Sequence, residues 1–262
     1  MQTQKNVVEM HPGKGILNID VLSFQRLAYR IFEETGGARE VLLDDTGKSM
    51  VLQKLVQQLR KNLPYLGSQM NKPGYLDEVK SLISEFMQYD IREEELQDML
   101  GKTGEDSLLH MKMQDVGVLY QAFLQYLEGH YMTGEGVMDA LKKAIPFSDK
   151  LKKSVLLLDG FTGFTPVQMN VIRELLNVCD KVLVTVTMDA GENPLQLGKP
   201  HQLFYMSRKM IHTLSGLTSN LDDPVLLKDE RKGRFGNSTS LDFLEKHLFR
   251  YRRSCLLYTS PS

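Results

Sequence analysis

Apolar residues recur at helical spacing over most of residues 40–145, and this section of the chain is predicted to be entirely helical. Turns are expected near residues 67–74 and 101–104, where glycines interrupt the pattern. Stripes of this kind are typical of a packed helical core rather than of a cofactor site. They consist of Val51, Leu52, Leu55, Val56, Leu59 and Leu63; Val79, Leu82, Ile83, Phe86 and Met87; Val116, Leu119, Tyr120, Phe123, Leu124 and Leu127; and Val137, Met138, Leu141 and Ile145.

Two helices and a strand are expected before this section. The pattern of residues 2–10 is helical, and the apolar content of residues 15–23 favours a strand. A second helix is predicted from Phe24 to Phe32, with Ser23 as its N-cap and the pair Gly36–Gly37 at its end.

After residue 150 the pattern becomes strand-like. Residues 155–158 form a short apolar run, and β-branched residues dominate residues 181–188. Between them, Thr165 and Pro166 are suited to begin a helix over residues 168–176. A strand, a helix and a strand within about 35 residues predict a parallel sheet. Residues 203–214 and 241–249 are expected to be helical, and residues 228–234 to form a mixed-charge loop.

Composition narrows the class of protein without identifying it. The chain has 262 residues, of which 42% are hydrophobic and 25% charged, as in soluble globular proteins. A net charge of −1 gives no whole-chain attraction for nucleic acid, so any DNA contact must come from local patches. No apolar run reaches the roughly 20 residues of a membrane span, and no signal peptide is recognised. Two cysteines, Cys179 and Cys255, exclude a disulfide framework and suit a reducing cytoplasm.

The strongest candidate for chemistry is Asp159, which ends the apolar run of residues 155–158 and precedes a glycine-rich turn. Ligands of parallel sheets lie at the carboxyl ends of the strands, and a carboxylate there suits Mg²⁺ beside nucleotide phosphates. The alternative is a helix cap or a structural turn. A phosphate-binding loop of the pattern G-x-x-x-x-G-K-[ST] is missing. The nearest imitation, Gly47-Lys48-Ser49, lacks the first glycine and follows no strand.

Residues 159–168, Asp-Gly-Phe-Thr-Gly-Phe-Thr-Pro-Val-Gln, resemble motif II of superfamily 1 helicases, approximately D-E-F-Q-D-T-N-x-x-Q. Residues 22–30, Leu-Ser-Phe-Gln-Arg-Leu-Ala-Tyr-Arg, resemble their T-F-H-x-L-A-x-R segment. The helical insertion between the two matches domain 1B inside domain 1A. More closely, residues 19–24, 159–166, 203–205 and 243–251 are similar to the AddB/RexB-type subunit of the AddAB-type ATP-dependent helicase–nuclease.

This resemblance implies an α/β fold: an incomplete P-loop NTPase (RecA-like) parallel sheet with a large all-helical insertion. Residues 1–38 and 149–225 are expected to be the two parts of helicase-like domain 1A, residues 39–148 the 1B-like insertion, and residues 226–253 the start of the following segment. Residues 254–262 resemble a translated sequencing adapter and are excluded from fold reasoning. That leaves Cys179 as the cysteine to interpret, and it is expected in the core.

The family also implies a much longer protein, with its P-loop upstream and a nuclease domain holding a 4Fe-4S cluster downstream. ATP and Mg²⁺ are the implied ligands. The implied partners are DNA and the AddA-type motor subunit of the heterodimer, in cytoplasmic double-strand break repair by homologous recombination. Gly160 stands where active helicases have the Glu that activates water, and Glu192 falls near a phosphate-sensing Gln. A carboxylate there would repel phosphate, so this protein is expected to hydrolyse ATP poorly and to guide DNA.

Site residues follow by resemblance. Asp159 and Gln168 are assigned to the nucleotide and Mg²⁺ side, although Gln168 is also interpreted as simply beginning a helix. Ser23, Phe24 and Arg26 are candidates for DNA contact, with a core position as the alternative for Phe24. No catalytic residue and no metal-ligand set is predicted.

Two other functions stay open, an active P-loop ATPase with its water-activating residue elsewhere and a non-catalytic helical adaptor. Without the P-loop strand, apolar surface is expected on the remaining sheet, which predicts marginal solubility.

Overall fold

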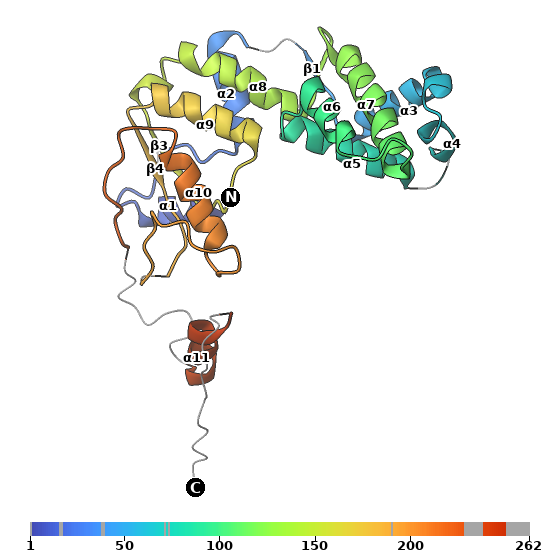
Figure 1. Cartoon of the computed structure of the whole chain (residues 1–262). Coiled ribbons are helices and arrows are strands. Elements are labelled where there is room, and N and C mark those ends of the chain that lie inside the picture. Colours follow the sequence, from blue (N-terminus) through green and yellow to red (C-terminus); the bar gives the residue numbers. More distant parts are fainter. Residues whose placement is uncertain are drawn as a thin grey trace. The chain divides into compact units, whose positions relative to one another are not determined.

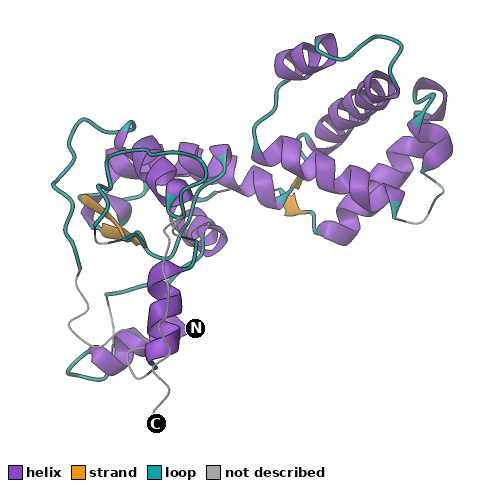
Figure 2. Ribbon diagram, turned by 60° about the horizontal axis from the view of Figure 1, so that its bottom comes forward, coloured by secondary structure: helices purple, strands orange, loops and turns teal. Residues whose placement is uncertain are grey.

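The computed structural model describes residues 2–15, 18–37, 40–70, 72, 74–189, 191–227 and 238–249. This part of the chain is mostly helical and holds two small parallel sheets (Figures 1 and 2). Its helices are α1 (Gln2–Met10), α2 (Phe24–Thr35), α3 (Asp45–Gln58), η1 (Arg60–Asn62), α4 (Leu66–Gln69), α5 (Tyr75–Gln88), α6 (Glu93–Gly101), α7 (Leu108–Leu127), α8 (Gly134–Ala144), η2 (Ile145–Phe147), η3 (Leu151–Lys153), α9 (Pro166–Val178), α10 (Tyr205–Ser215) and α11 (Thr239–His247). Its strands are β1 (Val41–Leu42), β2 (Tyr131–Met132), β3 (Val155–Leu158) and β4 (Lys181–Val184).

The chain divides into two compact units. The first comprises Met1–Ser154 and Thr165–Asp180, and the second comprises Val155–Phe164 and Lys181–Ser262. The division separates the strand pair β3–β4 from helix α9, which lies between these strands in the sequence.

Helices α3 to α7 of the first unit enclose the main hydrophobic core. Leu52, Leu119 and Phe123 are fully buried there, and Ile83 and Leu96 are nearly so. The helical stripes predicted for residues 51–63, 79–87 and 116–127 supply most of this core, so those predictions are confirmed.

The prediction of helix throughout residues 40–145 is wrong at two places. β1 and β2 pair in parallel, with Val41 opposite Tyr131 and Leu42 opposite Met132. Two residues are too few to show a period, and the pairing joins segments far apart in sequence, so no local pattern could indicate it.

Three helices of the first unit, α2, α8 and α9, pack against one another, with α8 contacting the other two (Figure 1). Their ends follow the predicted signals. The Ser23 hydroxyl accepts a hydrogen bond from the backbone N–H of Arg26, and Gly36 ends α2 at φ +77°. Thr165 caps α9, with Pro166 at its first position.

The second unit is built on the parallel pair β3–β4, in which Val155 lies opposite Lys181 and Leu158 opposite Val184. The predicted strands and their parallel direction are confirmed, although β4 ends four residues earlier than expected. One face of the pair is bare, since Val155 is 59%, Leu157 56% and Leu183 43% exposed. Parallel sheets are normally covered on both faces, and the described residues leave this face exposed.

The strand expected over residues 15–23 is wrong for the part that is described, because residues 18–23 are irregular. An isolated apolar segment gains nothing from a strand conformation unless another strand pairs with its backbone groups. Helices α10 and α11 begin two residues away from their expected starts. The loop expected over residues 228–234 lies outside the described residues.

Candidate functional site

Asp159 lies where the sequence predicts it, directly after β3 at the carboxyl edge of the two-stranded sheet. Thr185 directly follows β4 on the same edge, and its hydroxyl donates a hydrogen bond to Oδ1 of Asp159. The backbone N–H of Thr185 also donates to the carbonyl of Leu158 over 3.0 Å. A carboxylate and a hydroxyl therefore sit together at the ligand edge of the sheet, and both present the hard oxygen atoms that Mg²⁺ prefers.

Gly160 adopts a left-handed backbone conformation, with φ +77°. A Cβ atom at this position would meet nothing within 4 Å, so space does not exclude a larger residue. A non-glycine residue in this conformation costs about 1–2 kcal/mol. The turn after β3 thus favours glycine at the position where the helicase motif has glutamate.

Gln168 is used at the start of α9. Its Oε1 accepts the backbone N–H of Thr165 at 3.0 Å, and the Thr165 hydroxyl accepts the backbone N–H of Gln168 at 3.4 Å. This reciprocal pair is a capping box, which satisfies two backbone donors at the helix start. The side chain thereby has a structural task, and its place beside a nucleotide stays a prediction.

Glu192 is paired with a cation. The guanidinium of Arg208, whose side chain is only 6% exposed, lies 3.6 Å from the Glu192 carboxylate. Arg208 offsets part of the charge of Glu192, which weakens the predicted repulsion of phosphate, and that repulsion stays a prediction. Gln202 also accepts a hydrogen bond from Arg208, so this buried arginine joins the loop after β4 to helix α10.

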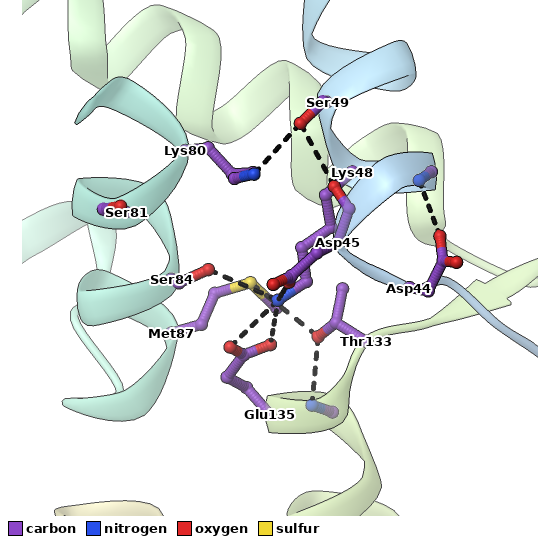
Figure 3. Close-up of polar contacts among 12 residues, drawn as sticks. Asp44, Asp45, Lys48, Ser49, Lys80, Ser81, Ser84, Met87, Thr133 and Glu135 are labelled. Atoms are coloured by element: carbon purple, nitrogen blue, oxygen red, sulfur yellow. Dashed lines mark hydrogen bonds and ion pairs between the residues drawn. The ribbon is translucent and has the colours of Figure 1, made fainter. Parts of the chain in front are cut away.

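Lys48 belongs to a buried ion pair. Its ammonium lies 3.0 Å from both carboxylate oxygens of Glu135 and 3.3 Å from the hydroxyl of Ser84 (Figure 3). The two paired side chains are 7% and 12% exposed. Burial raises the pKa of Glu135, but the hydrogen bonds and charge of Lys48 lower it more, and the net shift is downward. The Lys48 ammonium is thus bound to Glu135 of α8 and Ser84 of α5, and Gly47-Lys48-Ser49 is not a phosphate-binding loop.

This ion pair joins α3, at the start of the helical section of residues 40–145, to α8, at the end of that section. Asp44 caps α3 by accepting the N–H of Gly47, Lys80 donates to Ser49 over 3.1 Å, and Thr133 caps α8 (Figure 3). Together with the β1–β2 pair, these contacts tie the start of the section to its end. The polar groups that resemble a nucleotide site in sequence therefore stabilise the fold.

The three residues proposed for DNA contact lie at the start of α2. Ser23 and Arg26 are exposed, and Phe24 is half-buried. The Ser23 hydroxyl is occupied as the helix cap, over 3.3 Å to the N–H of Arg26. Arg26 leaves its guanidinium at the surface, so it is the member of the three best placed for a phosphate.

Sequence reasoning missed Thr185, Glu135 and Arg208. Thr185 could have been found from strand register, because it follows the start of its strand by four residues, as Asp159 does in the strand it pairs with. Nothing in the sequence marks Glu135 as the partner of Lys48, 87 residues away, or Arg208 as the partner of Glu192.

Other chemistry finds no site in the described part of the chain. Groups of three or more His, Cys, Asp or Glu that could hold a metal ion do not occur there, and no helix in it is long and apolar enough to cross a membrane. Cys179 is half-buried rather than in the core, and burial raises the pKa of its thiol, which makes it unreactive. Cys255 lies outside the described residues.

Comparison with known proteins places the chain in a family. A sequence model of the family described as "ADDB, N-terminal" matches residues 1–245. Three similar proteins are each named as the B-subunit of an ATP-dependent helicase/deoxyribonuclease. The one from Lachnoclostridium phytofermentans is 44% identical over 259 residues, covering 96% of this chain and 22% of its own length. Those from Desulforamulus reducens and Clostridium acetobutylicum are 32% and 31% identical, over 91% and 95% of this chain and 21% and 22% of theirs.

The chain thus spans about a fifth of the length of these curated relatives. The match runs through both structural units and through the segment around Asp159. The chain belongs to the ADDB N-terminal family.

Proposed function

We propose that this chain is the N-terminal part of a helicase–nuclease subunit that processes DNA ends in double-strand break repair by homologous recombination. Its role there is a helicase-like scaffold that guides DNA for the AddA-type partner, which drives movement by hydrolysing ATP. A nuclease domain elsewhere in the parent protein cuts the guided strand. The relatives' name, the B-subunit of an ATP-dependent helicase/deoxyribonuclease, supports the assembly and the reaction class.

One observation carries the nucleotide part of the proposal: Asp159 and Thr185 together at the carboxyl edge of a parallel strand pair. Their oxygen atoms fit the Mg²⁺ of a Mg²⁺–ATP complex, which usually keeps several waters as further ligands. The phosphates themselves require a cradle of backbone N–H groups. We assign that cradle to a part of the parent protein other than the described residues, on a strand that completes the sheet.

Weak hydrolysis follows from Gly160. A base that activates water typically contributes about 10²–10⁴ to the rate of hydrolysis. Glycine supplies no such base, and its φ of +77° makes the turn unfavourable for the missing glutamate. Glu192 cannot replace it as a free group, because Arg208 pairs with it.

The remaining assignments extend beyond this chain. Four cysteines hold a 4Fe-4S cluster, and this sequence has two, so we assign the cluster to the downstream nuclease domain. The bare face of β3 and β4 supports an incomplete RecA-like sheet, with residues 1–38 and 149–225 as domain 1A, residues 39–148 as the 1B-like insertion and residues 226–253 as the next segment. We place the assembly in the cytoplasm, with the bacterial DNA.

The test uses the complete parent protein in complex with its partner. The lysine of the partner's own phosphate loop is replaced, so that any remaining ATP hydrolysis belongs to the parent protein. We expect binding of a fluorescent ATP analogue to persist, with hydrolysis at least about 10²-fold below that of the intact complex. Asp159→Asn should weaken Mg²⁺-dependent binding of the analogue, whereas the matched variant Asp180→Asn, at an exposed position just before β4, should not.

Two outcomes would contradict the proposal. Hydrolysis that persists at a rate similar to that of the intact complex would favour an active ATPase. An unchanged analogue affinity in Asp159→Asn, with DNA unwinding unaffected by removal of this N-terminal part, would favour a helical adaptor.

A further inference from the structure

The segment from the end of α8 to the end of η3 is strongly basic. Residues 142–153 contain Lys142, Lys143, Lys150, Lys152 and Lys153 and a single acid, Asp149. We call this segment the lysine-rich turn. Its net charge is +4, from five lysines and one aspartate, and the Glu34 carboxylate that is bonded to the turn reduces the local charge to +3, in contrast with −1 for the whole chain. A local patch of this kind is what a protein without overall positive charge needs for an anionic partner.

Most of this charge is available at the surface. Lys152 donates to the carboxylate of Asp149 over 2.9 Å, so these two groups largely neutralise each other. Lys143, Lys150 and Lys153 are exposed, and none of them takes part in an ion pair within the described part of the chain. Lys150 and Lys153 bracket the single turn of η3, and a 3₁₀-helix rises only about 2 Å per residue, so their backbones lie close together.

The backbone of the lysine-rich turn is held firmly. The carboxylate of Glu34 on α2 accepts the hydroxyl of Ser148 at 2.7 Å and the backbone N–H groups of Asp149 and Lys150 at 2.9 and 3.1 Å. Ile145 and Ser148 are fully buried and Leu151 is nearly so, which anchors the turn at intervals between its exposed residues. A surface that is already ordered loses little conformational entropy when a ligand binds.

Phe147 stands out from this anchored backbone. Its side chain is 74% exposed, although its neighbours Ile145 and Ser148 are fully buried. It also lines an open groove of about 750 Å³ whose charged residues are Glu40, Glu128, Asp139 and Lys143, so the surface suited to phosphates is the lysine-rich turn and not the groove. An exposed aromatic ring beside lysines is the combination by which proteins bind single-stranded nucleic acid, since the ring stacks on a base and the lysines contact phosphates.

We propose that the lysine-rich turn is a contact site for single-stranded DNA. Lys143, Lys150 and Lys153 contact successive phosphates, and Phe147 stacks on a base. This inference rests on the proposed function and names the surface that would guide the strand. An acidic polypeptide would also be attracted by the lysines, but it gains little from an exposed ring, so the aromatic residue favours DNA.

The experiment measures binding of a fluorescent oligo(dT) to the 262-residue chain by anisotropy over a range of salt concentrations. Each phosphate contact on a single strand contributes about 0.7 to the slope of log affinity against log salt. We expect the triple variant Lys143→Gln, Lys150→Gln, Lys153→Gln to reduce this slope by about 2. The matched control replaces the exposed residues Lys102, Lys199 and Lys209 by Gln, which changes the net charge equally and should leave the slope almost unchanged.

Phe147 has its own variants. Loss of one stacked base weakens binding by about 5- to 150-fold, so Phe147→Ala should fall in this range and Phe147→Tyr should restore affinity. Circular dichroism confirms that each variant is folded. Should a variant unfold, a photoreactive phenylalanine analogue at position 147 of the complete parent protein, in complex with its partner, tests the same contact. That analogue should cross-link to DNA, whereas the same analogue at exposed Tyr89 should not.

The outcomes separate this inference from the proposed function. Absence of DNA binding by the wild-type chain at low salt would count against both. Wild-type binding with equal slopes for the triple variant and its control, or an unaffected Phe147→Ala, would overturn the lysine-rich turn alone and move the contact elsewhere, for example to Arg26. Displacement of the DNA by poly-glutamate, together with an unchanged DNA affinity of Phe147→Ala, would assign the surface to an acidic protein segment and also overturn the inference.

Discussion

The buried pair of Lys48 and Glu135 permits a quantitative prediction. Lys48→Met keeps a side chain of similar length and removes the ammonium that lies 3.0 Å from both oxygens of Glu135. The carboxylate then stays in a place where it is only 12% exposed, with no compensating cation. Removing one partner of such a pair lowers the free energy of unfolding by about 3–5 kcal/mol, because the remaining charge is buried without a partner that offsets its lost hydration.

A loss of this size is a large part of the roughly 5–15 kcal/mol by which a typical domain is stable. The double variant Lys48→Met, Glu135→Leu removes both charges and fills the same space with apolar atoms. It is expected to be within about 1 kcal/mol of the wild type, since replacing a buried pair as a whole is often neutral or better. The difference between the single and double variants therefore isolates the cost of the unpaired charge.

Hydrogen exchange of α3 and α8 in increasing urea is the suitable measurement, because it reports on the first unit separately from the second. We expect acid to restore part of the stability that the Lys48→Met variant loses. In the wild type the folded pKa of Glu135 is lowered, so its contribution is complete above a pH of about 4.5 and is lost as pH falls through the folded value. Without Lys48, burial is opposed only by the hydrogen bonds from the Glu135 backbone and from Thr133. We therefore expect the folded pKa of Glu135 to rise above the unfolded one, and the variant to regain relative stability as pH falls.

Three results would refute this reasoning. Lys48→Met could destabilise α3 and α8 by less than about 1 kcal/mol. The double variant could be as unstable as the single one, which would mean that packing rather than charge carries the effect. The single variant could also lose stability in acid in parallel with the wild type.

Three further predictions concern the same unit. Asp115→Ala should cost about 2–3 kcal/mol in urea denaturation, because one buried carboxylate oxygen accepts the N–H groups of Tyr65 and Leu66, each at 2.8 Å, and Asp115→Asn should cost less. The hydrogen bond from Ser148, together with two backbone bonds, holds the pKa of Glu34 below its usual value, so the wild type should lose stability as pH falls through that folded pKa and Glu34→Gln should not show this step. Burial raises the pKa of Tyr120 from 10.0 to about 12, so in alkaline titration one phenolate signal should appear late and be missing in Tyr120→Phe, while stability falls as pH rises through this range.

Much of the local structure could be predicted from the sequence. The N-caps Ser23 and Thr165, the left-handed Gly36 and the apolar run that ends at Asp159 all act through neighbours a few residues away. The sequence leaves Gln168 open between a helix start and a nucleotide site, and the structure shows the helix start. Sequence patterns succeed here because each signal and the group it satisfies belong to the same turn of chain.

The candidate site could be predicted only in part. The sequence locates Asp159 at the edge of a strand, because a terminal acid after an apolar run is a local feature. The sequence also places a carboxylate at Glu192 but does not indicate its partner Arg208, which belongs to a later helix. An ion pair between separate elements depends on how those elements pack, and the sequence around either residue does not indicate that packing.

The sequence by itself determined most of the helices, the strands β3 and β4, the caps of α2 and α9, and the acid that ends β3, because those properties depend on short-range sterics, capping and apolar periodicity. Only the tertiary structure decided that β1 pairs with β2, that Lys48 neutralises Glu135, and that Glu34 anchors the lysine-rich turn. Each of these contacts joins residues more than 80 positions apart. Such contacts form because burying an apolar core brings distant segments together, and a polar group carried into that core must then find a partner.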